Sequence, residues 1–113
     1  MRPKVILNCA ASADGKIALS NRQRLELSNN EDFERVHLLR SKYDAILVGI
    51  GTIIEDNPSL TVNPKYNSAK NPIRIVLDTK CRTPRNAKIL DGKSKTILAI
   101  GEGIEPTPIQ NAE

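Results

Sequence analysis

The sequence predicts a layered α/β fold built on a mainly parallel sheet. Four short apolar runs, at residues 4–11, 45–48, 73–77 and 96–100, are separated by turn-forming residues. Between the first two runs, residues 30–42 carry apolar side chains at helical spacing. Strands that alternate with helical or looping connections are typical of α/β sheets. A crossover of this length joins parallel neighbours and is expected to be right-handed.

The first run, residues 4–11 with the sequence KVILNCAA, is apolar at both alternating sets of positions. This pattern predicts a central strand that is buried on both faces. Cys9 lies inside the run and is therefore expected to be a buried thiol. A turn is expected at residues 12–16, where Gly15 can adopt the positive φ that other residues resist.

The helix predicted over residues 30–42 has a start signal and an apolar stripe. Ser28 stands three residues before Glu31, the spacing of a capping box. The apolar side chains of this segment recur three or four residues apart and fall on one face: Phe33, Val36, Leu39 and Tyr43.

The most informative segment is residues 48–62, which follow the second predicted strand. Gly49 and Gly51 let the backbone turn tightly and leave room for a ligand. Thr52 and Glu55 fit a second capping box, so a short helix with anion-attracting amides is expected there. However, Gly-x-Gly is common in loops, and Ile54 replaces the third glycine of the dinucleotide fingerprint. Both interpretations stay open on spacing alone.

The composition of the chain argues against several classes of function. The chain has 113 residues, a net charge of +4, 3 % aromatic residues, two cysteines and one histidine. Few aromatics argue against a base-stacking nucleic-acid surface, and the dispersed positive charge suits a small anionic ligand. Isolated cysteines and a single histidine argue against a zinc site, so no metal is expected. Because no signal peptide and no apolar run of roughly 20 residues is visible, a cytoplasmic location without membrane contact is expected.

Polar residues follow most of the predicted strands. Ligands of open α/β sheets bind at the carboxyl ends of the strands, which here are residues 11–16, 49–56, 78–80 and Gly101. Residues 63–72 are expected to form a polar loop and residues 82–86 an irregular segment. The domain is expected to extend over residues 1–101, with residues 102–113 as a polar, proline-containing tail or linker.

Four segments in register resemble one enzyme family. They are residues 13–18 (ADGKIA), 34–40 (ERVHLLR), 48–62 (VGIGTIIEDNPSLTV) and 72–78 (PIRIVLD). The chain resembles, as far as about Leu90, the riboflavin-pathway pyrimidine reductases, whose fold is like that of dihydrofolate reductase. The Val-Gly-Ile-Gly-Thr form is more similar to the stand-alone type than to the domain that is fused to a deaminase.

The resemblance implies NADPH-dependent reduction of a ribosylamino-pyrimidine 5′-phosphate to its ribitylamino form. The hydride would reach the C1′ carbon of the sugar, and the family implies a homodimer when complete. Motif position implies substrate contacts at Arg40 and Leu60, and no catalytic acid can be assigned. The same comparison implies cofactor contacts at Ala11, Thr52, Asp56, Leu77, Asp78, Thr79 and Lys80.

Each implied role has a simpler structural alternative. Arg40 could be a solvated arginine near a helix C-terminus, where the helix dipole favours it. Asp78 could cap a turn, and Asp56 could hydrogen-bond the backbone of its own Asn-Pro turn. His37 fits a helix-surface or boundary histidine better than a general acid. Asn63 stands where the family often has a basic or imidazole residue.

The family is about twice as long as this chain, and its second half carries a Gly-Gly-Gly loop for the cofactor pyrophosphate. The chain therefore resembles the N-terminal part of a reductase, and a half-sheet would leave an unpaired edge and an open apolar face. We expect the 113 residues alone to show little turnover and to self-associate. Two alternatives remain: a non-catalytic nucleotide- or phosphate-binding module, and a subunit that completes the sheet of another chain.

Overall fold

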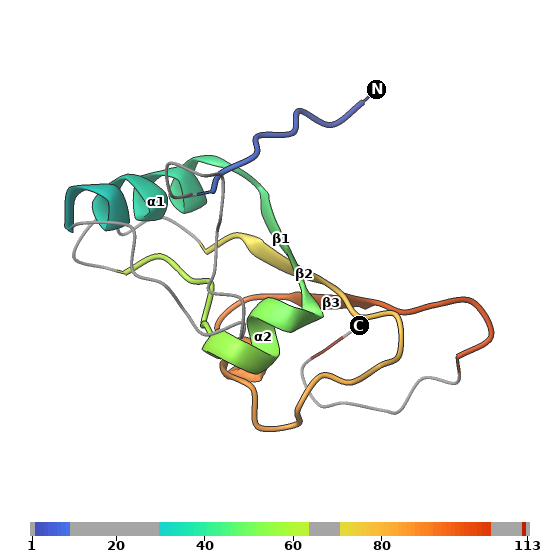
Figure 1. The fold of residues 1–113 in the computed structure, drawn as a ribbon. Helices are drawn as coiled ribbons and strands as arrows, with labels where there is room; N and C mark the ends of the chain where they lie inside the picture. Colours follow the sequence, from blue (N-terminus) through green and yellow to red (C-terminus); the bar gives the residue numbers. More distant parts are fainter. Residues whose placement is uncertain (1, 10–29, 64–70, 105–111, 113) are drawn as a thin grey trace, which may run out of the picture.

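The computed structural model describes residues 2–9, 30–63, 71–104 and 112. Three strands in this part of the chain form one parallel sheet in the order β1-β2-β3, with β2 in the middle (Figure 1). The predicted mainly parallel α/β sheet is thereby confirmed. In chain order the elements are α1 (Asn30–Lys42), β1 (Ala45–Gly49), α2 (Ile50–Asp56), β2 (Ile73–Leu77), the 3-10 helix η1 (Lys88–Leu90) and β3 (Thr96–Ala99).

The two faces of the sheet differ in how they are covered. Val48, Val76 and Leu98 are aligned across the strands, and the face that they form packs against α2 and the segment around η1. Val76 in the middle strand is fully buried on this face. The buried core comprises Ile50, Ile53, Leu60, Val76, Ala87, Ile89 and Leu90.

The opposite face carries Leu47, Ile75 and Ile97, which are also aligned across the strands. Leu47 is 56 % exposed. Leu77, which lies two residues after Ile75 in β2 and on the same face, is 48 % exposed. Apolar side chains in the middle of a sheet are normally covered, because each buried aliphatic side chain contributes about 1.5–3 kcal/mol. The described part of the protein therefore has one packed and one open sheet face.

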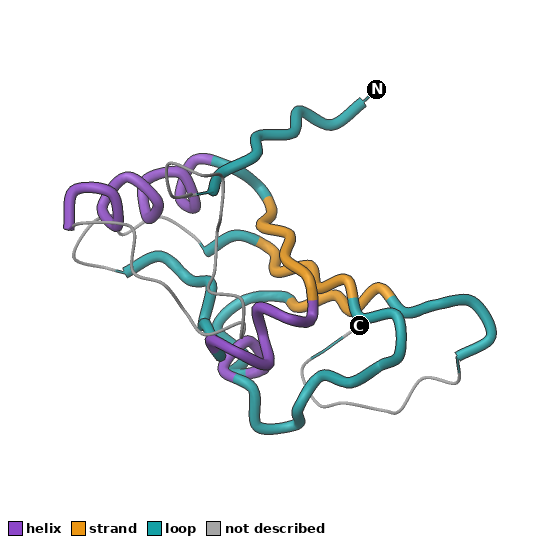
Figure 2. Tube along the Cα trace, in the orientation of Figure 1, coloured by secondary structure: helices purple, strands orange, loops and turns teal. Residues whose placement is uncertain are grey.

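Helix α1 has the predicted bounds, and it lies beside the amino-terminal end of β1 in Figure 2. Glu31 and Asp32 lie in its first turn, and Arg40 and Lys42 in its last, which is the favourable order for the helix dipole. Asp32 also pairs with Arg35 at 2.7 Å. None of the side chains of α1 is fully buried, so the predicted stripe is only partly covered. Among the described helices, none has the length and apolar character needed to cross a membrane.

The predicted first strand is wrong over residues 4–9, which form no strand and are exposed. Val5 and Leu7 are 81 % and 90 % exposed, and the Cys9 thiol is exposed rather than buried. Asn8 instead accepts a hydrogen bond from Arg35 of α1 at 2.8 Å, away from the sheet. An apolar run shows that a segment can be buried, but a strand also needs a partner edge, which the pattern does not specify.

Helix α2 begins at Ile50, directly after β1, so the predicted capping box at Thr52 is also wrong. Gly49 is the N-cap residue, with an extended φ of −84° and no side-chain cap. Thr52 lies inside the first turn because the backbone enters the helix straight from the strand. Helix α2 ends at the Asn-Pro turn that the sequence indicates after Asp56, since Asn57 has a φ of 44° and its N–H donates to Ile53 O.

Some predictions concern residues outside the described part of the chain. They are the turn at 12–16, the Ser28 cap, the Ala11 contact, most of the loop at 63–72 and most of the tail at 102–113.

Candidate functional site

The carboxyl ends of β2 and β3 are held together closely. Gly101 N donates to Thr79 O at 2.9 Å, and Asp78 N donates to Ala99 O at 2.9 Å. A Cβ atom on Gly101 would lie 2.9 Å from Thr79 O, which is too close for any larger residue without a backbone shift. Glycine at 101 thus allows the two strand ends to meet at the edge where the sequence predicts a ligand.

Among the described residues, the space beside Gly49 and Gly51 is open. Beyond its chain neighbours and the backbone of its own helix, a Cβ atom on either glycine would meet no described atom within 4 Å, and neither glycine has a positive φ. The backbone turns from β1 directly into α2 at Gly49, but without the positive φ that would require a glycine. The predicted room for a ligand agrees with the space beside the two glycines. Thr52 and Asp56 lie four residues apart on α2, on the same side of the helix, and both are exposed.

Asp78 holds the turn that follows β2. One carboxylate oxygen accepts a hydrogen bond from Arg82 N at 2.8 Å. The other accepts hydrogen bonds from Thr83 N at 2.8 Å and Thr83 Oγ1 at 2.6 Å. Burial acts to raise the pKa of Asp78, but these hydrogen bonds and the charge of Arg82 together lower it. The carboxylate is fully engaged in the turn, as the structural alternative predicts.

The other predicted cofactor residues of this turn lie around the Asp78 carboxylate. Leu77 is half-exposed at the end of β2, and Thr79 and Lys80 are exposed. Cys81 adopts a φ of 54°, a left-handed conformation that is uncommon for residues with a side chain. The turn thus presents its backbone and the Lys80 side chain at the edge of the sheet in one fixed shape.

A second irregular segment, residues 59–63, lies at the other end of α2. Leu60 has a φ of 56° and is buried, which for a branched side chain costs on the order of 1–3 kcal/mol. Arg40 of α1 donates to Thr61 O at 3.2 Å. The structure therefore brings the two predicted substrate residues, Arg40 and Leu60, to the same segment.

His37 also lies at this segment, although its position in the sequence predicts only a helix-surface or boundary histidine. Its Nδ1 accepts a hydrogen bond from Asn63 N at 3.1 Å, so the proton of the neutral ring is on Nε2. Burial and then the nearby Arg40 charge lower the pKa of His37. Since His37 precedes Arg40 by three residues on one helix, the spacing itself contains the signal that both face residues 59–63.

Burial also lowers the pKa of Arg40, whose guanidinium nevertheless stays charged at neutral pH. Within the described part of the chain, the Nε atoms of Arg40 and Arg74 are buried and lack an acceptor. Unsatisfied buried donors are uncommon in folded proteins.

The mainly parallel sheet with its helices, together with the likeness to solved reductase structures, gives the chain a dihydrofolate-reductase-like fold. The chain belongs to the RibD C-terminal domain family, whose model matches residues 3–112. The resemblance to the riboflavin-pathway pyrimidine reductases, inferred from the sequence, is thereby confirmed.

Two archaeal relatives are named 2,5-diamino-6-ribosylamino-4(3H)-pyrimidinone 5′-phosphate reductase. The one from Archaeoglobus fulgidus is 44 % identical over 88 % of this chain, and the match covers 49 % of the relative. The one from Methanothermobacter thermautotrophicus is 44 % identical over 94 % of this chain and again 49 % of the relative. The chain therefore spans about half the length of these relatives.

A solved structure supports the same assignment. The diaminohydroxyphosphoribosylaminopyrimidine deaminase/5-amino-6-(5-phosphoribosylamino)uracil reductase of Thermotoga maritima superposes with a TM-score of 0.74 at 30 % identity. The superposition covers 92 % of this chain and 30 % of that protein.

Proposed function

We propose that the natural protein containing this chain is an NADPH-dependent oxidoreductase of riboflavin biosynthesis. It reduces a ribosylamino-pyrimidine 5′-phosphate to the ribitylamino form. The observation that carries the proposal is that two sets of residues lie next to each other along the chain, one on a short helix and the other on the segment that follows it. Exposed Thr52 and Asp56 lie on α2 itself, and the Arg40–Leu60 cluster lies on the segment directly after it.

The cofactor side fits a nicotinamide dinucleotide. The open space beside Gly49 and Gly51 lets a ligand approach the main chain, and Thr52 and Asp56 supply a hydroxyl and a carboxylate there. The backbone of Leu77 and Thr79, with the Lys80 side chain, would hold the cofactor at the end of β2. When bound, NADPH supplies the hydride that the substrate's C1′ carbon receives.

The protein residues bind and orient the substrate. Arg40 would hold the substrate 5′-phosphate through charge-assisted hydrogen bonds. Because the segment at residues 59–63 is fixed by side chains from other elements, the substrate would find its subsite already formed. A preformed site aligns the C1′ carbon with the nicotinamide without an ordering cost at each turnover.

The test is an assay of the natural protein that contains these residues, with the 113-residue chain beside it. Both are incubated with NADPH or NADH and with the diamino or the deaminated ribosylamino-pyrimidine phosphate. We expect the natural protein to form the ribitylamino product with NADPH, and the 113-residue chain to turn over little. Failure of the natural protein with all four combinations would overturn the proposal. Cofactor binding without turnover would instead indicate a binding module.

A further inference from the structure

Arg74 is a fully buried charged residue in the middle strand of the sheet. It lies two residues before Val76 and therefore on the packed face, where its side chain is 0 % exposed. A charge in such a position needs partners for its hydrogen-bond donors, since burying it alone is strongly unfavourable. Its partners show what the residue does.

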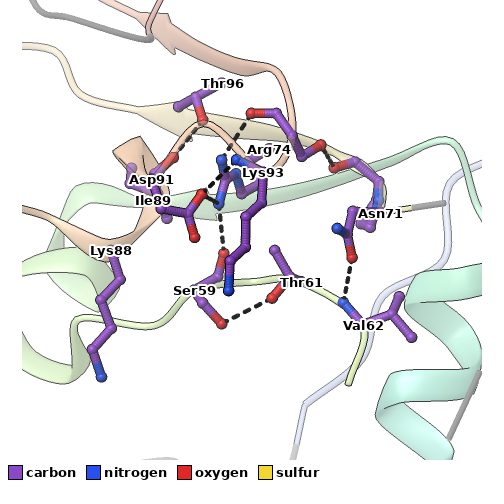
Figure 3. A network of polar contacts seen from close by, with 12 residues as sticks. Ser59, Thr61, Val62, Asn71, Arg74, Lys88, Ile89, Asp91, Lys93 and Thr96 are labelled. Atoms are coloured by element: carbon purple, nitrogen blue, oxygen red, sulfur yellow. Dashed lines mark hydrogen bonds and ion pairs between the residues drawn. The ribbon is translucent and has the colours of Figure 1, made fainter. Parts of the chain in front are cut away.

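The guanidinium of Arg74 connects β2 to two other segments, one at Ser59 and one at residues 91–94 (Figure 3). Its Nη1 donates to Ser59 O at 3.1 Å and to Asp91 Oδ1 at 3.0 Å. Its Nη2 donates to Ser94 O at 2.8 Å. Asp91 is fixed in turn by Lys93 N at 2.9 Å. The contact that reaches the candidate site is the one to Ser59 O.

Ser59 directly precedes Leu60, the buried residue in the left-handed conformation. On the other side of Leu60, the Thr61 carbonyl accepts a hydrogen bond from Arg40 at 3.2 Å. Two arginines from different elements thus hold the carbonyls on both sides of one strained residue. Such a conformation persists only where the surroundings impose it, so losing either contact would let the segment relax.

We propose that Arg74 is a positioning residue of the substrate site. It fixes Ser59 O, maintains the left-handed backbone of Leu60, and so keeps Thr61 O in place for Arg40. Arg74 does not touch the substrate in this account; it acts through residues 59–61. The inference rests on the proposed function in assigning Arg40 to the substrate phosphate.

The first variant is Arg74→Lys, which keeps the charge but loses the planar group that reaches several acceptors at once. The matched control is Thr96→Val. Thr96 is paired in register with Arg74, is equally buried, and its hydroxyl donates to Ile89 O at 2.6 Å. The control removes a buried hydrogen bond from the same core without a contact to residues 59–63.

The natural protein is assayed with both variants. Arg74→Lys is expected to raise KM for the phosphorylated pyrimidine at least ten-fold and to leave KM for NADPH within two-fold. Thr96→Val is expected to lower the Tm and to change neither KM. If Arg74→Lys lowers only the Tm, as its control does, Arg74 is a structural core residue and the proposal is overturned.

Two further measurements keep the proposal testable. If Arg74→Lys does not fold, Asp91→Asn weakens the charged anchor of Arg74 while keeping an acceptor at the same atom. It is expected to raise the same KM two- to five-fold, and an unchanged KM would count against the proposal. Independently of activity, amide exchange at Val62 and Asn63 should accelerate in Arg74→Lys relative to the amides of β2, but not in Thr96→Val. If the natural protein has no reductase activity, this exchange measurement still decides the role of Arg74.

Discussion

Two irregular segments flank the candidate site, and they are held in different ways. The turn at residues 78–83 is held by its own Asp78 carboxylate, which accepts from residues four and five positions ahead, and by backbone hydrogen bonds to the end of β3. The segment at residues 59–63 is held by side chains from other parts of the chain. Its polar backbone partners are Arg74 for Ser59 O, Arg40 for Thr61 O, Asn71 for Val62 N and His37 for Asn63 N.

The difference shows how a local and a non-local site are built. The side-chain contacts that shape the turn at residues 78–83 come from a residue of the turn itself. A segment held from outside keeps its shape only while α1, β2 and their connections stay in place. We therefore expect changes at residues 78–83 to act on stability first, and changes around residues 59–63 to act on substrate binding.

The largest expected effect is that of Asp78→Ala. It removes three hydrogen bonds and leaves the N–H and hydroxyl of Thr83 buried without an acceptor. Each unsatisfied group costs about 1–3 kcal/mol, so a loss of about 3 kcal/mol or more is expected. Chemical denaturation measures it, and an unchanged free energy of unfolding would show that the turn does not depend on Asp78.

The same residue predicts a direction for pH dependence. The pKa of Asp78 is lower in the folded state than in the unfolded state. Its contribution to stability is therefore present above the ordinary Asp range and is lost as the pH falls through the lowered pKa. Asp78→Ala should show a shallower loss of stability below about pH 4, the unfolded range of Asp. Parallel acid-unfolding curves for both proteins would contradict this.

Arg40→Met is expected to act on substrate binding. One charge-assisted contact contributes about 1.5–3 kcal/mol, so KM for the phosphorylated pyrimidine should rise by roughly one to two orders of magnitude. A dephosphorylated analogue should be affected little. Equal losses for both substrates in a steady-state assay would show that Arg40 does not contact the phosphate.

Gly101→Ala tests the close approach of the two strand ends. The added Cβ would lie 2.9 Å from Thr79 O and 3.0 Å from Thr79 Cγ2. Overpacking of this kind costs about 1–3 kcal/mol. The matched control is Gly51→Ala, whose Cβ meets no described residue outside its own helix within 4 Å and which should not destabilise the helix. Equal melting temperatures for the two variants would contradict the geometry.

Asp56→Ala should have the smallest effect on stability. Asp56 is exposed at the end of α2, so its replacement should change the free energy of unfolding by no more than about 0.5 kcal/mol. Cofactor use by the natural protein should nevertheless weaken, measured as a higher KM for NADPH. A lower Tm with unchanged cofactor use would identify Asp56 as a turn cap only.

The structural features that depend on residues close together in the sequence could be predicted from the sequence. The bounds of α1 and β2 agree with the predicted ones, and Asn57 ends α2 as its turn chemistry indicates. The alternative that Asp78 caps a turn was also available from the sequence, because the partners of its carboxylate lie within five residues.

The features that depend on partners far away in the sequence could not be predicted from the sequence. Arg74 occupies an alternating position beside Val76 in an apolar strand, which indicates burial, but its acceptors are 15 to 20 residues away. Residues 4–9 have the composition of a strand, yet the pattern does not say which edge would pair with them. The left-handed Leu60 has no local signal either, because its conformation is imposed by contacts from outside.

The most direct test of the central claim compares Asp56→Ala and Arg40→Met in one steady-state experiment on the natural protein. KM for NADPH and KM for the phosphorylated pyrimidine are measured for each variant. The two-region account predicts that Asp56→Ala raises only the NADPH constant and that Arg40→Met raises only the substrate constant. If both variants raise the same constant, or if Asp56→Ala raises the substrate constant alone, the assignment of α2 to the cofactor and of residues 59–63 to the substrate is wrong.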